Sequence, residues 1–489
     1  MDVLLRFGQT QFGNSALRQV GVAPPPKLRR SRVGWRPRIA EDGVAIVGGT
    51  ASPVTEALSR VLARSGFRVG WVGEYEHAAP FEVPARVWAE PLVRLTERSD
   101  PEAQGLSHRY AALIYDGSEI RSSEALDDVY QFFHTHLRKL GTGARVVILG
   151  RPAAAVQGAE ARAVQRSLEG FTRSLAKELG RKGSTVNLIK VENGGEPCLA
   201  APLRFFLSSF SAYITGQVLS VSPSVHVKRG EEPDFINDED AAFRPRALVG
   251  KRAIVTGAAG GIGEQTAECL AREGAYVIVV DRPEESERAG RVATRLGGEA
   301  LLCDLGEPAA ADLVAERARA LGGVDIVVHN AGVTRDKTLS RMKQASWDVV
   351  MEVNLRAILR LNSRLLGERL LLDNGRIVLL SSVGGIAGNV GQTNYATTKA
   401  ALIDLAKEIS TQLADRGITC NAIAPGFIET RMTARMPFAI REAARRLSSL
   451  NQGGKPKDVA EAITFLCAPA SGGVQGRTLR VCGGALIGA

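Results

Sequence analysis

The sequence has few of the features that mark a membrane, secreted or metal-binding protein. It contains no run of eighteen apolar residues, so no segment is long enough to cross a membrane as a helix. Its six cysteines form no C-x-x-C pair and lie among apolar or small residues, as buried free thiols do. The first twenty residues lack the apolar stretch of a secretory signal. We therefore expect no metal site, no disulfide, no membrane association and a cytoplasmic location.

The charge balance is moderately basic. The 62 Lys and Arg residues outnumber the 52 Asp and Glu residues, which gives a formal net charge of +10. Part of the excess lies in one basic cluster near the N-terminus: Lys27, Arg29, Arg30, Arg32, Arg36 and Arg38. This cluster lacks the regular aromatic interleaving that base stacking requires, so we expect no nucleic-acid partner. An Arg-rich surface or an anionic substrate accounts for the charge.

The chain contains an internal repeat. A shift of 208 positions matches Leu62 with Leu270, and a shift of 234 positions matches Asn187 with Asn421. The repeat is about 200 residues long and predicts two copies of one domain. We divide the chain into a proline-rich arm, a first copy, a polar linker and a second copy, at residues 1–42, 43–225, 226–249 and 250–489.

The second copy alternates buried strands with helical stretches. The expected strands are near 252–256, 276–280, 300–303, 324–328, 376–381, 418–424 and 478–482. Strands that are apolar on both faces and separated by helices predict a parallel sheet covered on both sides. The fold class is therefore α/β, with two doubly wound, Rossmann-like domains, of which the first is a degenerate, flavodoxin-like copy.

A glycine-rich turn, TGAAGGIG at 256–263, follows the first strand of the second copy. Gly257 permits a sharp turn, and Gly261 and Gly263 let the backbone approach a pyrophosphate at a helix N-terminus. Asp281 ends the second strand, where a carboxylate can bond both ribose hydroxyls and repels a 2′-phosphate. The turn itself carries no Arg or Lys. The pattern predicts a dinucleotide site that prefers NAD(H) to NADP(H).

Three further side chains of the second copy suggest acid–base chemistry. Tyr395 and Lys399 are four residues apart and therefore share one face of a predicted helix. Ser382 ends a strand at the carboxyl edge of the sheet, where doubly wound folds bind ligands. A tyrosine phenol has a pKa of about 10, and an adjacent ammonium stabilises its phenolate. We therefore expect Lys399 to lower the pKa of Tyr395.

These residues occur together with HNAG at 329–332, Asn354 and PG at 425–426, in the order found in short-chain dehydrogenases/reductases. The second copy resembles this family over residues 250–489. Stretches such as APGFIETRM at 424–432 resemble 3-oxoacyl-[acyl-carrier-protein] reductases of the FabG type. The two-copy build resembles the high-molecular-weight subgroup of those enzymes, which uses NADH and acts on acyl-CoA esters.

The resemblance implies a role for each catalytic residue. Tyr395 protonates the carbonyl oxygen of a 3-oxoacyl thioester, and Ser382 donates a hydrogen bond to that oxygen. Lys399 bonds the nicotinamide ribose, and Asn354 holds a water that relays protons. The implied NAD(H) contacts are Gly257, Gly261, Ile262, Gly263, Asp281, Asp304, Leu305, Asn330, Ala331, Gly332, Tyr395, Lys399, Pro425, Gly426, Ile428 and Thr430.

The resemblance also implies an activity and an assembly. The activity is NADH-dependent reduction of 3-oxoacyl thioesters in fatty-acid metabolism, and the assembly is a homodimer. Carrier-protein reductases commonly have basic residues where this chain has Asp373 and Asn374, although Arg416 is retained. Acyl-CoA is therefore at least as good a candidate substrate as acyl-carrier protein. A dehydrogenase of steroids, sugars or small alcohols, and a non-catalytic NAD-binding scaffold, are the alternatives.

The first copy has lost the residues that carry this chemistry. Pro53, Thr55 and Gly73 stand at the positions of Gly261, Gly263 and Asp281, and Ala161, Gln165 and Arg151 stand at those of Tyr395, Lys399 and Ser382. The counterpart of residues 427–458, which form the substrate lid in the family, is largely missing between Glu192 and Leu203. We expect the first copy neither to bind a dinucleotide in the usual way nor to catalyse.

Overall fold

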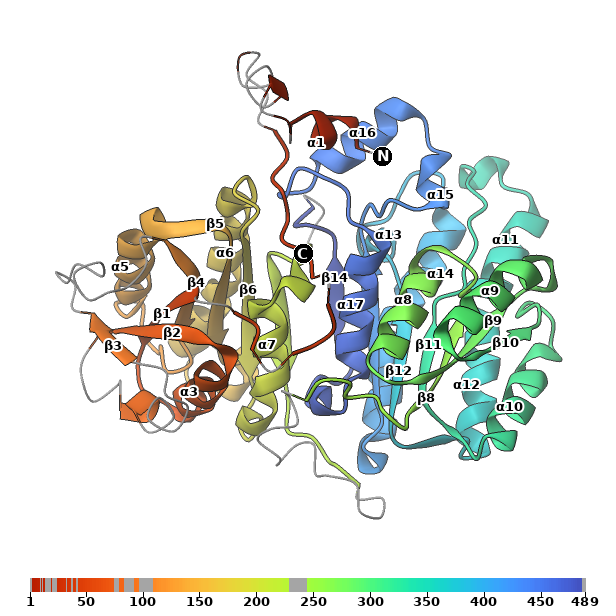
Figure 1. The fold of residues 1–489 in the computed structure, drawn as a ribbon, viewed down its shortest axis with the longest axis horizontal. Helices are drawn as coiled ribbons and strands as arrows, with labels where there is room; N and C mark the ends of the chain where they lie inside the picture. Colours follow the sequence, from red (N-terminus) through yellow and green to blue (C-terminus); the bar gives the residue numbers. More distant parts are fainter. Residues whose placement is uncertain are drawn as a thin grey trace.

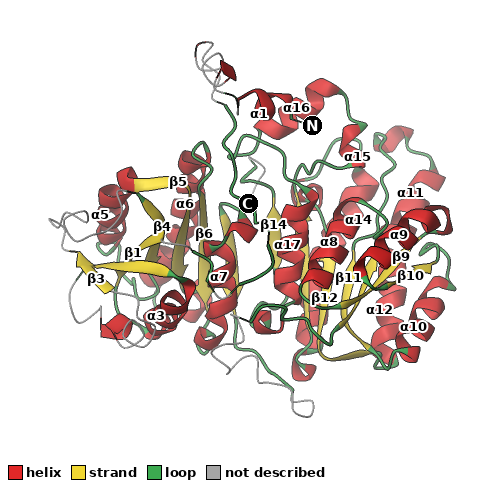
Figure 2. Ribbon diagram, in the orientation of Figure 1, coloured by secondary structure: helices red, strands yellow, loops and turns green. Residues whose placement is uncertain are grey.

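The computed structural model describes residues 2–8, 10, 12–13, 19, 24–31, 33–36, 38–40, 43–73, 79–82, 92–95, 109–227 and 244–485. Within these residues the chain forms two parallel sheets of seven strands each, with helices packed on both faces (Figures 1 and 2). The predicted α/β class with two doubly wound domains is confirmed. No helix in the described part of the chain is both long and apolar enough to span a membrane.

The first sheet has the order β3-β2-β1-β4-β5-β6-β7. Its strands are β1 (Gly43–Gly49), β2 (Phe67–Val72), β3 (Leu92–Leu95), β4 (Tyr110–Asp116), β5 (Leu140–Gly150), β6 (Thr185–Val191) and β7 (Gln217–Val221). The helices around it are α3 (Pro53–Ser65), α5 (Leu126–His136), α6 (Ala159–Gly180) and α7 (Ala200–Leu207). The strand β6 is buried along its whole length, as a strand covered on both faces must be.

The second sheet has the order β10-β9-β8-β11-β12-β13-β14. Its strands are β8 (Arg252–Thr256), β9 (Tyr276–Asp281), β10 (Glu299–Leu302), β11 (Val324–His329), β12 (Leu371–Leu380), β13 (Thr419–Pro425) and β14 (Thr478–Val481). Every strand expected from the sequence is present. Strand β12 begins at Leu371, earlier than expected, because its first residues pair with Val324 before an irregularity in the register.

The helices of the second copy cover its sheet and include the segment that was expected to form the substrate lid. They are α8 (Gly261–Arg272), α9 (Ser286–Leu296), α10 (Ala310–Ala320), α11 (Gln344–Met351), α12 (Ala357–Gly367), α13 (Val383–Ala387), α14 (Thr393–Gln412), α15 (Arg431–Ala434), α16 (Phe438–Arg446) and α17 (Pro456–Cys467). A π-helical turn at Glu352–Arg356 joins α11 to α12. Helices α15 and α16 form the segment that has no counterpart in the first copy, where only a 3₁₀ turn at Glu196–Leu199 separates β6 from α7.

Both sheets have the same strand order when their strands are matched along the chain, as a duplication requires. The register agrees with the repeat: Asn187 pairs with Val147 in the first sheet, and Asn421 pairs with Val378 in the second. The last strands, β7 and β14, contact each other, so the two sheets meet edge to edge (Figure 1).

The arm and the linker are described in part. A short helix, α1 (Val3–Gly8), lies beside α16, where Asp2 forms an ion pair with Arg446 at 2.8 Å (Figure 1). Residues 24–31 have no regular secondary structure, as expected for a proline-rich arm. The acidic stretch of the predicted linker, at 228–243, lies outside the described residues.

Candidate active site

The glycine-rich turn joins β8 to α8 at the carboxyl edge of the second sheet. Gly257 and Gly261 have φ angles of 65° and 61°, in the left-handed region that favours glycine. A Cβ at Gly263 would lie 2.2 Å from the carbonyl oxygen of Gly257, so only glycine permits this close approach. Each of the three glycines named from the sequence therefore has a steric reason for its position.

The N-terminus of α8 is open to an anion. Its N-cap residue is Gly260, which has no side chain to accept a hydrogen bond from the first backbone N–H groups. A Cβ at Gly261 would meet nothing within 4 Å, so the space directly beside Gly261 is empty of protein atoms. An exposed helix N-terminus with free N–H groups favours a phosphate.

Asn330 and Ala331, at the end of β11, hold the turn from the side. The Asn330 amide donates to the carbonyl oxygens of Thr256 at 2.9 Å and Gly257 at 3.0 Å. The backbone N–H groups of Asn330 and Ala331 both donate to the Thr256 hydroxyl. The Asn330 side chain thus fixes the shape of the turn rather than facing open space.

The acidic residues expected near the adenosine are held by local backbone groups. The Asp281 carboxylate accepts hydrogen bonds from the N–H groups of Ala259 at 2.8 Å and Arg282 at 2.9 Å. Asp304 is exposed at the end of β10, and its carboxylate accepts from the N–H of Gly306 at 2.9 Å. Both carboxylates face the same edge as the turn, since β9 and β10 are parallel to β8.

Ile262 and Leu305 were also expected to contact a cofactor. Both are partly buried, and their side chains pack against the hydrophobic cores on the two faces of the sheet.

Ser382 lies at the start of α13, directly after β12. Its hydroxyl oxygen accepts a hydrogen bond from the N–H of Gly384 at 3.1 Å, which caps the helix and leaves the hydroxyl hydrogen free to donate elsewhere. The neighbouring Ser381 hydroxyl donates to the Lys399 carbonyl oxygen at 2.6 Å and so ties β12 to α14. A Cβ at Gly385 would lie 2.6 Å from the Lys399 backbone, so these elements are in close contact.

Tyr395 and Lys399 lie one turn apart on α14, as their spacing predicts. The Lys399 Nζ lies 5.6 Å from the centroid of the Tyr395 ring and donates to the Leu380 carbonyl oxygen at 2.6 Å. Lys399 is 2% exposed, and this burial lowers its pKa to about 8.

The pKa of Tyr395 is raised overall, against the direction expected from Lys399, which is not among the causes of the shift. Burial is the largest cause and disfavours the phenolate. A hydrogen bond with Ser382 acts in the opposite direction, and the charge of Asp336 adds to the increase. The sequence shows the one-turn spacing but not the depth of the site, so the effect of burial could not be predicted.

Asn354 lies within the π-helical turn between α11 and α12 and is fully buried. Its amide oxygen accepts from the Val333 N–H at 2.8 Å, and its amide nitrogen donates to the Val333 carbonyl at 3.0 Å. A Cβ at Gly332 would lie 3.3 Å from the Asn354 Oδ1 and 3.4 Å from the Lys399 Nζ. Asn354 and Lys399 therefore meet at Gly332, and π-helical turns of this kind often occur at functional sites.

The segment after β13 leads into the lid. Pro425 ends the strand, and a Cβ at Gly426 would lie 2.8 Å from the Cβ of Cys482. Ile428 is buried and forms a parallel bridge with Gly454. Thr430 is the N-cap of α15 and accepts from the Thr433 N–H. The backbone of this segment thus runs along the same edge as the other expected residues.

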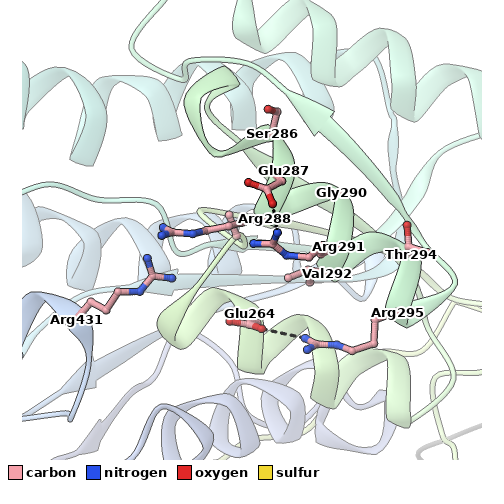
Figure 3. Close-up of a pocket in the computed structure, with 11 residues that line it drawn as sticks. Glu264, Ser286, Glu287, Arg288, Gly290, Arg291, Val292, Thr294, Arg295 and Arg431 are labelled. Atoms are coloured by element: carbon pink, nitrogen blue, oxygen red, sulfur yellow. Dashed lines mark hydrogen bonds and ion pairs between the residues drawn. The ribbon is translucent and has the colours of Figure 1, made fainter.

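A cavity of about 750 Å³ lies beside the glycine-rich turn, between the start of α8 and helix α9 (Figure 3). Arginine side chains line much of this cavity. In Figure 3 the side chains of Arg288 and Arg431 point to the same end of the cavity. Arg288 is paired with Glu285 at 2.9 Å, and Arg295 is paired with Glu264 at 2.9 Å. Arg431 forms no ion pair with any residue that the structure describes.

The sequence reasoning missed Arg431. The turn carries no basic residue of its own, yet a Cβ at Gly260 would lie 3.0 Å from the Arg431 Nη2. A signal was present, because Arg431 directly follows Thr430 in the APGFIETRM stretch. Its approach to the turn depends on the path of the lid, which spacing along the chain does not define.

In the first copy, the helix N-terminus at the corresponding edge of the sheet is capped by side chains of the protein. The Ser52 hydroxyl caps α3 by accepting from the N–H groups of Val54 and Thr55 at 3.1 Å each. Asp116 accepts from the hydroxyls of Ser52 at 2.8 Å and Thr55 at 2.6 Å. Side chains of the protein itself therefore occupy the helix N-terminus that is open in the second copy.

The residues of the first copy that correspond to the catalytic residues also form hydrogen bonds and ion pairs within the first copy. The Gln165 amide, at the position of Lys399, donates to the carbonyls of Gly117 at 2.8 Å and Ile120 at 2.9 Å. Arg151, at the position of Ser382, forms a partly buried ion pair with Glu196 at 2.6 Å. No pair of groups for proton transfer remains at these positions.

Comparison with known proteins agrees with the geometry of the second copy. Residues 257–485 match a family model described as enoyl-(acyl carrier protein) reductase. The 3-oxoacyl-[acyl-carrier-protein] reductase of Thermotoga maritima is 40% identical over 244 residues, which are 49% of this chain and 99% of that protein. The corresponding reductase of Escherichia coli is 40% identical over 236 residues, 48% of this chain and 97% of that protein.

A solved structure is also similar. A short chain dehydrogenase from Burkholderia cenocepacia, in complex with NADP, is 34% identical, covers 48% of this chain and 98% of that chain, and has a TM-score of 0.46. The family model does not extend over the first copy. Through its C-terminal half, the chain belongs to the short-chain dehydrogenase/reductase family.

Proposed function

We propose that the second copy is an NADH-dependent reductase of 3-oxoacyl thioesters. The observation that carries this proposal is the meeting of four side chains beside an uncapped glycine-rich turn: Asn354, Ser382, Tyr395 and Lys399. The similarity to 3-oxoacyl-[acyl-carrier-protein] reductases, each matched over nearly its whole length, supports the same reaction.

The cofactor part of the proposal rests on the shape of the turn. The open space at Gly261 and the uncapped start of α8 fit a pyrophosphate. A carboxylate at the end of β9, as Asp281 is, can accept from ribose hydroxyls and repels a 2′-phosphate, and this supports NADH in the proposal. When bound, the cofactor supplies the hydride that the protein side chains cannot provide.

The protein side chains handle the proton and the oxygen atom. Burial keeps the Tyr395 phenol protonated, so it can donate its proton to the oxygen of the substrate carbonyl. The Ser382 hydroxyl donates a hydrogen bond to the same oxygen, because its own oxygen is already bonded by the Gly384 N–H. The Lys399 ammonium stabilises the phenolate that remains, and Asn354 fixes the backbone of Val333 beside it.

Acyl-CoA is the preferred form of the substrate in this proposal. Arg416, the basic residue retained from carrier-protein reductases, is paired with Asp373 at 2.7 Å. Asn374 is also engaged, since its amide bonds both the N–H and the carbonyl of Val227. Arg416 therefore offers no unpaired cation to an acidic carrier protein, and Asn374 carries no charge. We further propose a homodimer formed through the long helices α12 and α14, where Leu359 is 43% exposed.

The test is oxidation of NADH, followed at 340 nm, with acetoacetyl-CoA as substrate. The wild-type protein is expected to oxidise NADH faster than NADPH. Tyr395→Phe, which keeps the ring and removes the proton, is expected to lower kcat at least a hundredfold. Full activity of this variant, or no turnover of any 3-oxoacyl thioester by the wild type, would overturn the proposal.

A further inference from the structure

The two copies contact each other through equivalent elements. Helix α7 of the first copy packs against α17 of the second (Figure 1). Phe205 stacks on Phe465, with ring centroids 4.3 Å apart and planes 6° apart. These two phenylalanines are equivalent, 260 positions apart, like Leu219 and Leu479 in the last strands. Equivalent residues touch only near a two-fold axis, so the contact has the form of a symmetric dimer interface within one chain.

This pseudo-symmetry is broken at Tyr213. The equivalent residue of the second copy is Gly473, where a Cβ would lie 2.4 Å from the Cβ of Cys198. Only the first copy therefore has a tyrosine at this position of the interface, and this tyrosine faces the second copy. Only the second copy has the lid segment, α15 and α16. The asymmetry suggests that Tyr213 serves the lid rather than the interface in general.

Tyr213 fills a space bounded by two glycines of the second copy. It is 1% exposed, and its hydroxyl donates to the carbonyl oxygen of Gln452 at 2.8 Å. A Cβ at Gly454 would lie 2.5 Å from the ring, and a Cβ at Gly483 would lie 2.6 Å from it. The ring is thus packed between the loop that follows the lid and the segment that follows β14.

The loop held by Tyr213 is bonded in turn to both parts of the lid. The hydroxyl of Ser448, just after α16, also donates to the Gln452 carbonyl oxygen, at 2.8 Å. The N–H of Gly454 donates to the carbonyl of Phe427, and the N–H of Glu429 donates to the carbonyl of Gly454. Tyr213 is therefore bonded to this loop, and the loop is bonded to the segment that follows Gly426 and leads into α15.

Two further contacts complete this connection. Arg445 on α16 donates to both carboxylate oxygens of Glu429, at 2.6 and 2.8 Å, which joins the two ends of the lid. The Gln452 amide donates to the carbonyl of Pro26 in the N-terminal arm at 2.7 Å. The base of the lid is held by the first copy on one side and by the arm on the other.

We propose that the first copy positions the substrate lid, and that Tyr213 is the positioning residue through which it does so. Tyr213 keeps residues 448–454 in place, and these residues keep Phe427–Glu429 and α16 in the arrangement that binds substrate. The kinetic part of this inference rests on the proposed reductase function, whereas the structural part does not.

The test compares Tyr213→Phe with Tyr115→Phe in the full-length protein. Both changes remove one hydroxyl from a buried tyrosine of the first copy, but Tyr115 packs in a different core cluster, against Phe132 and Phe133. Loss of one neutral hydrogen bond corresponds to about a fivefold change in an equilibrium. Tyr213→Phe should raise the KM for acetoacetyl-CoA about fivefold with kcat unchanged, and Tyr115→Phe should change neither.

Hydrogen exchange provides a readout that does not depend on activity. Residues 427–454 should exchange faster in Tyr213→Phe than in the wild type, with strand β4 unchanged, and Tyr115→Phe should leave residues 427–454 as they are. Unchanged exchange in Tyr213→Phe, a KM that stays constant, or equal effects of both variants overturns the inference. If the wild type reduces no 3-oxoacyl thioester, the proposed function fails. The hydrogen exchange of residues 427–454 then tests by itself whether Tyr213 positions this segment.

Discussion

The burial of Lys399 predicts a pH-dependent effect on stability. Its side chain is 2% exposed, and burial lowers its pKa from the usual 10.5 to about 8. A tenfold change in a protonation equilibrium corresponds to about 1.36 kcal/mol, so the buried charge costs the folded state about 3 kcal/mol when both states are protonated. Lys399→Met removes the charge and keeps most of the volume of the side chain.

The direction of the change in stability with pH depends on whether the folded or the unfolded state releases the Lys399 proton at the lower pH. Below pH 8 both states carry the charge, and the full cost is present. Between pH 8 and 10.5 the folded protein binds fewer protons than the unfolded chain, so the stability of the wild type rises with pH. Above pH 10.5 the cost is absent.

The assay is urea denaturation of wild type and Lys399→Met at several values between pH 7 and 10.5, followed by a signal from the second copy. The stability of the wild type relative to the variant should rise by about 3 kcal/mol across this range. Other groups that change their protonation in this range cancel in the comparison because they are the same in both proteins. A difference that does not change with pH would refute the burial of a charged Lys399.

The cofactor residues give two further predictions. Asp281→Ala removes the charge that opposes a 2′-phosphate, so the ratio of kcat/KM for NADPH to that for NADH should rise at least tenfold; an unchanged ratio would show that Asp281 does not select the cofactor. Arg431→Ala should weaken NADH binding about tenfold in a fluorescence titration, because the guanidinium lies over the start of α8, while Arg435→Ala, one turn further on, should leave it unchanged. Equal binding by both variants would argue against a contact with phosphate.

The strands and the residues at their carboxyl ends could be predicted because they depend on local patterns. Buried apolar runs define parallel strands, and the order of the strands brings Ser382, Asn330 and the glycine-rich turn to one edge. Tyr395 and Lys399 share a helix face for the same kind of reason, since helical periodicity is fixed. The duplication also located the lost residues of the first copy, such as Gln165.

The features that could not be predicted depend on contacts between distant segments. Burial is the main cause of the raised pKa of Tyr395, and no spacing in the sequence encodes burial. The hydrogen bond between Tyr213 and Gln452 joins residues 239 positions apart. The approach of Arg431 to Gly260 requires the path of the lid. In each case the chain supplies the residue type, but only the packed structure supplies its neighbour.

The meeting of β7 with β14 has a consequence for solubility. Each is the last strand of its sheet, and an unprotected last strand offers free N–H and C=O groups to any other extended chain. Here the Ser222 N–H donates to the Gly473 carbonyl and the Gly483 N–H donates to the Tyr213 carbonyl, just beyond the two strands. Each copy thus covers the edge strand of the other, β7 or β14. Separation of the two copies would expose both of these strand edges at once and make them available for strand addition.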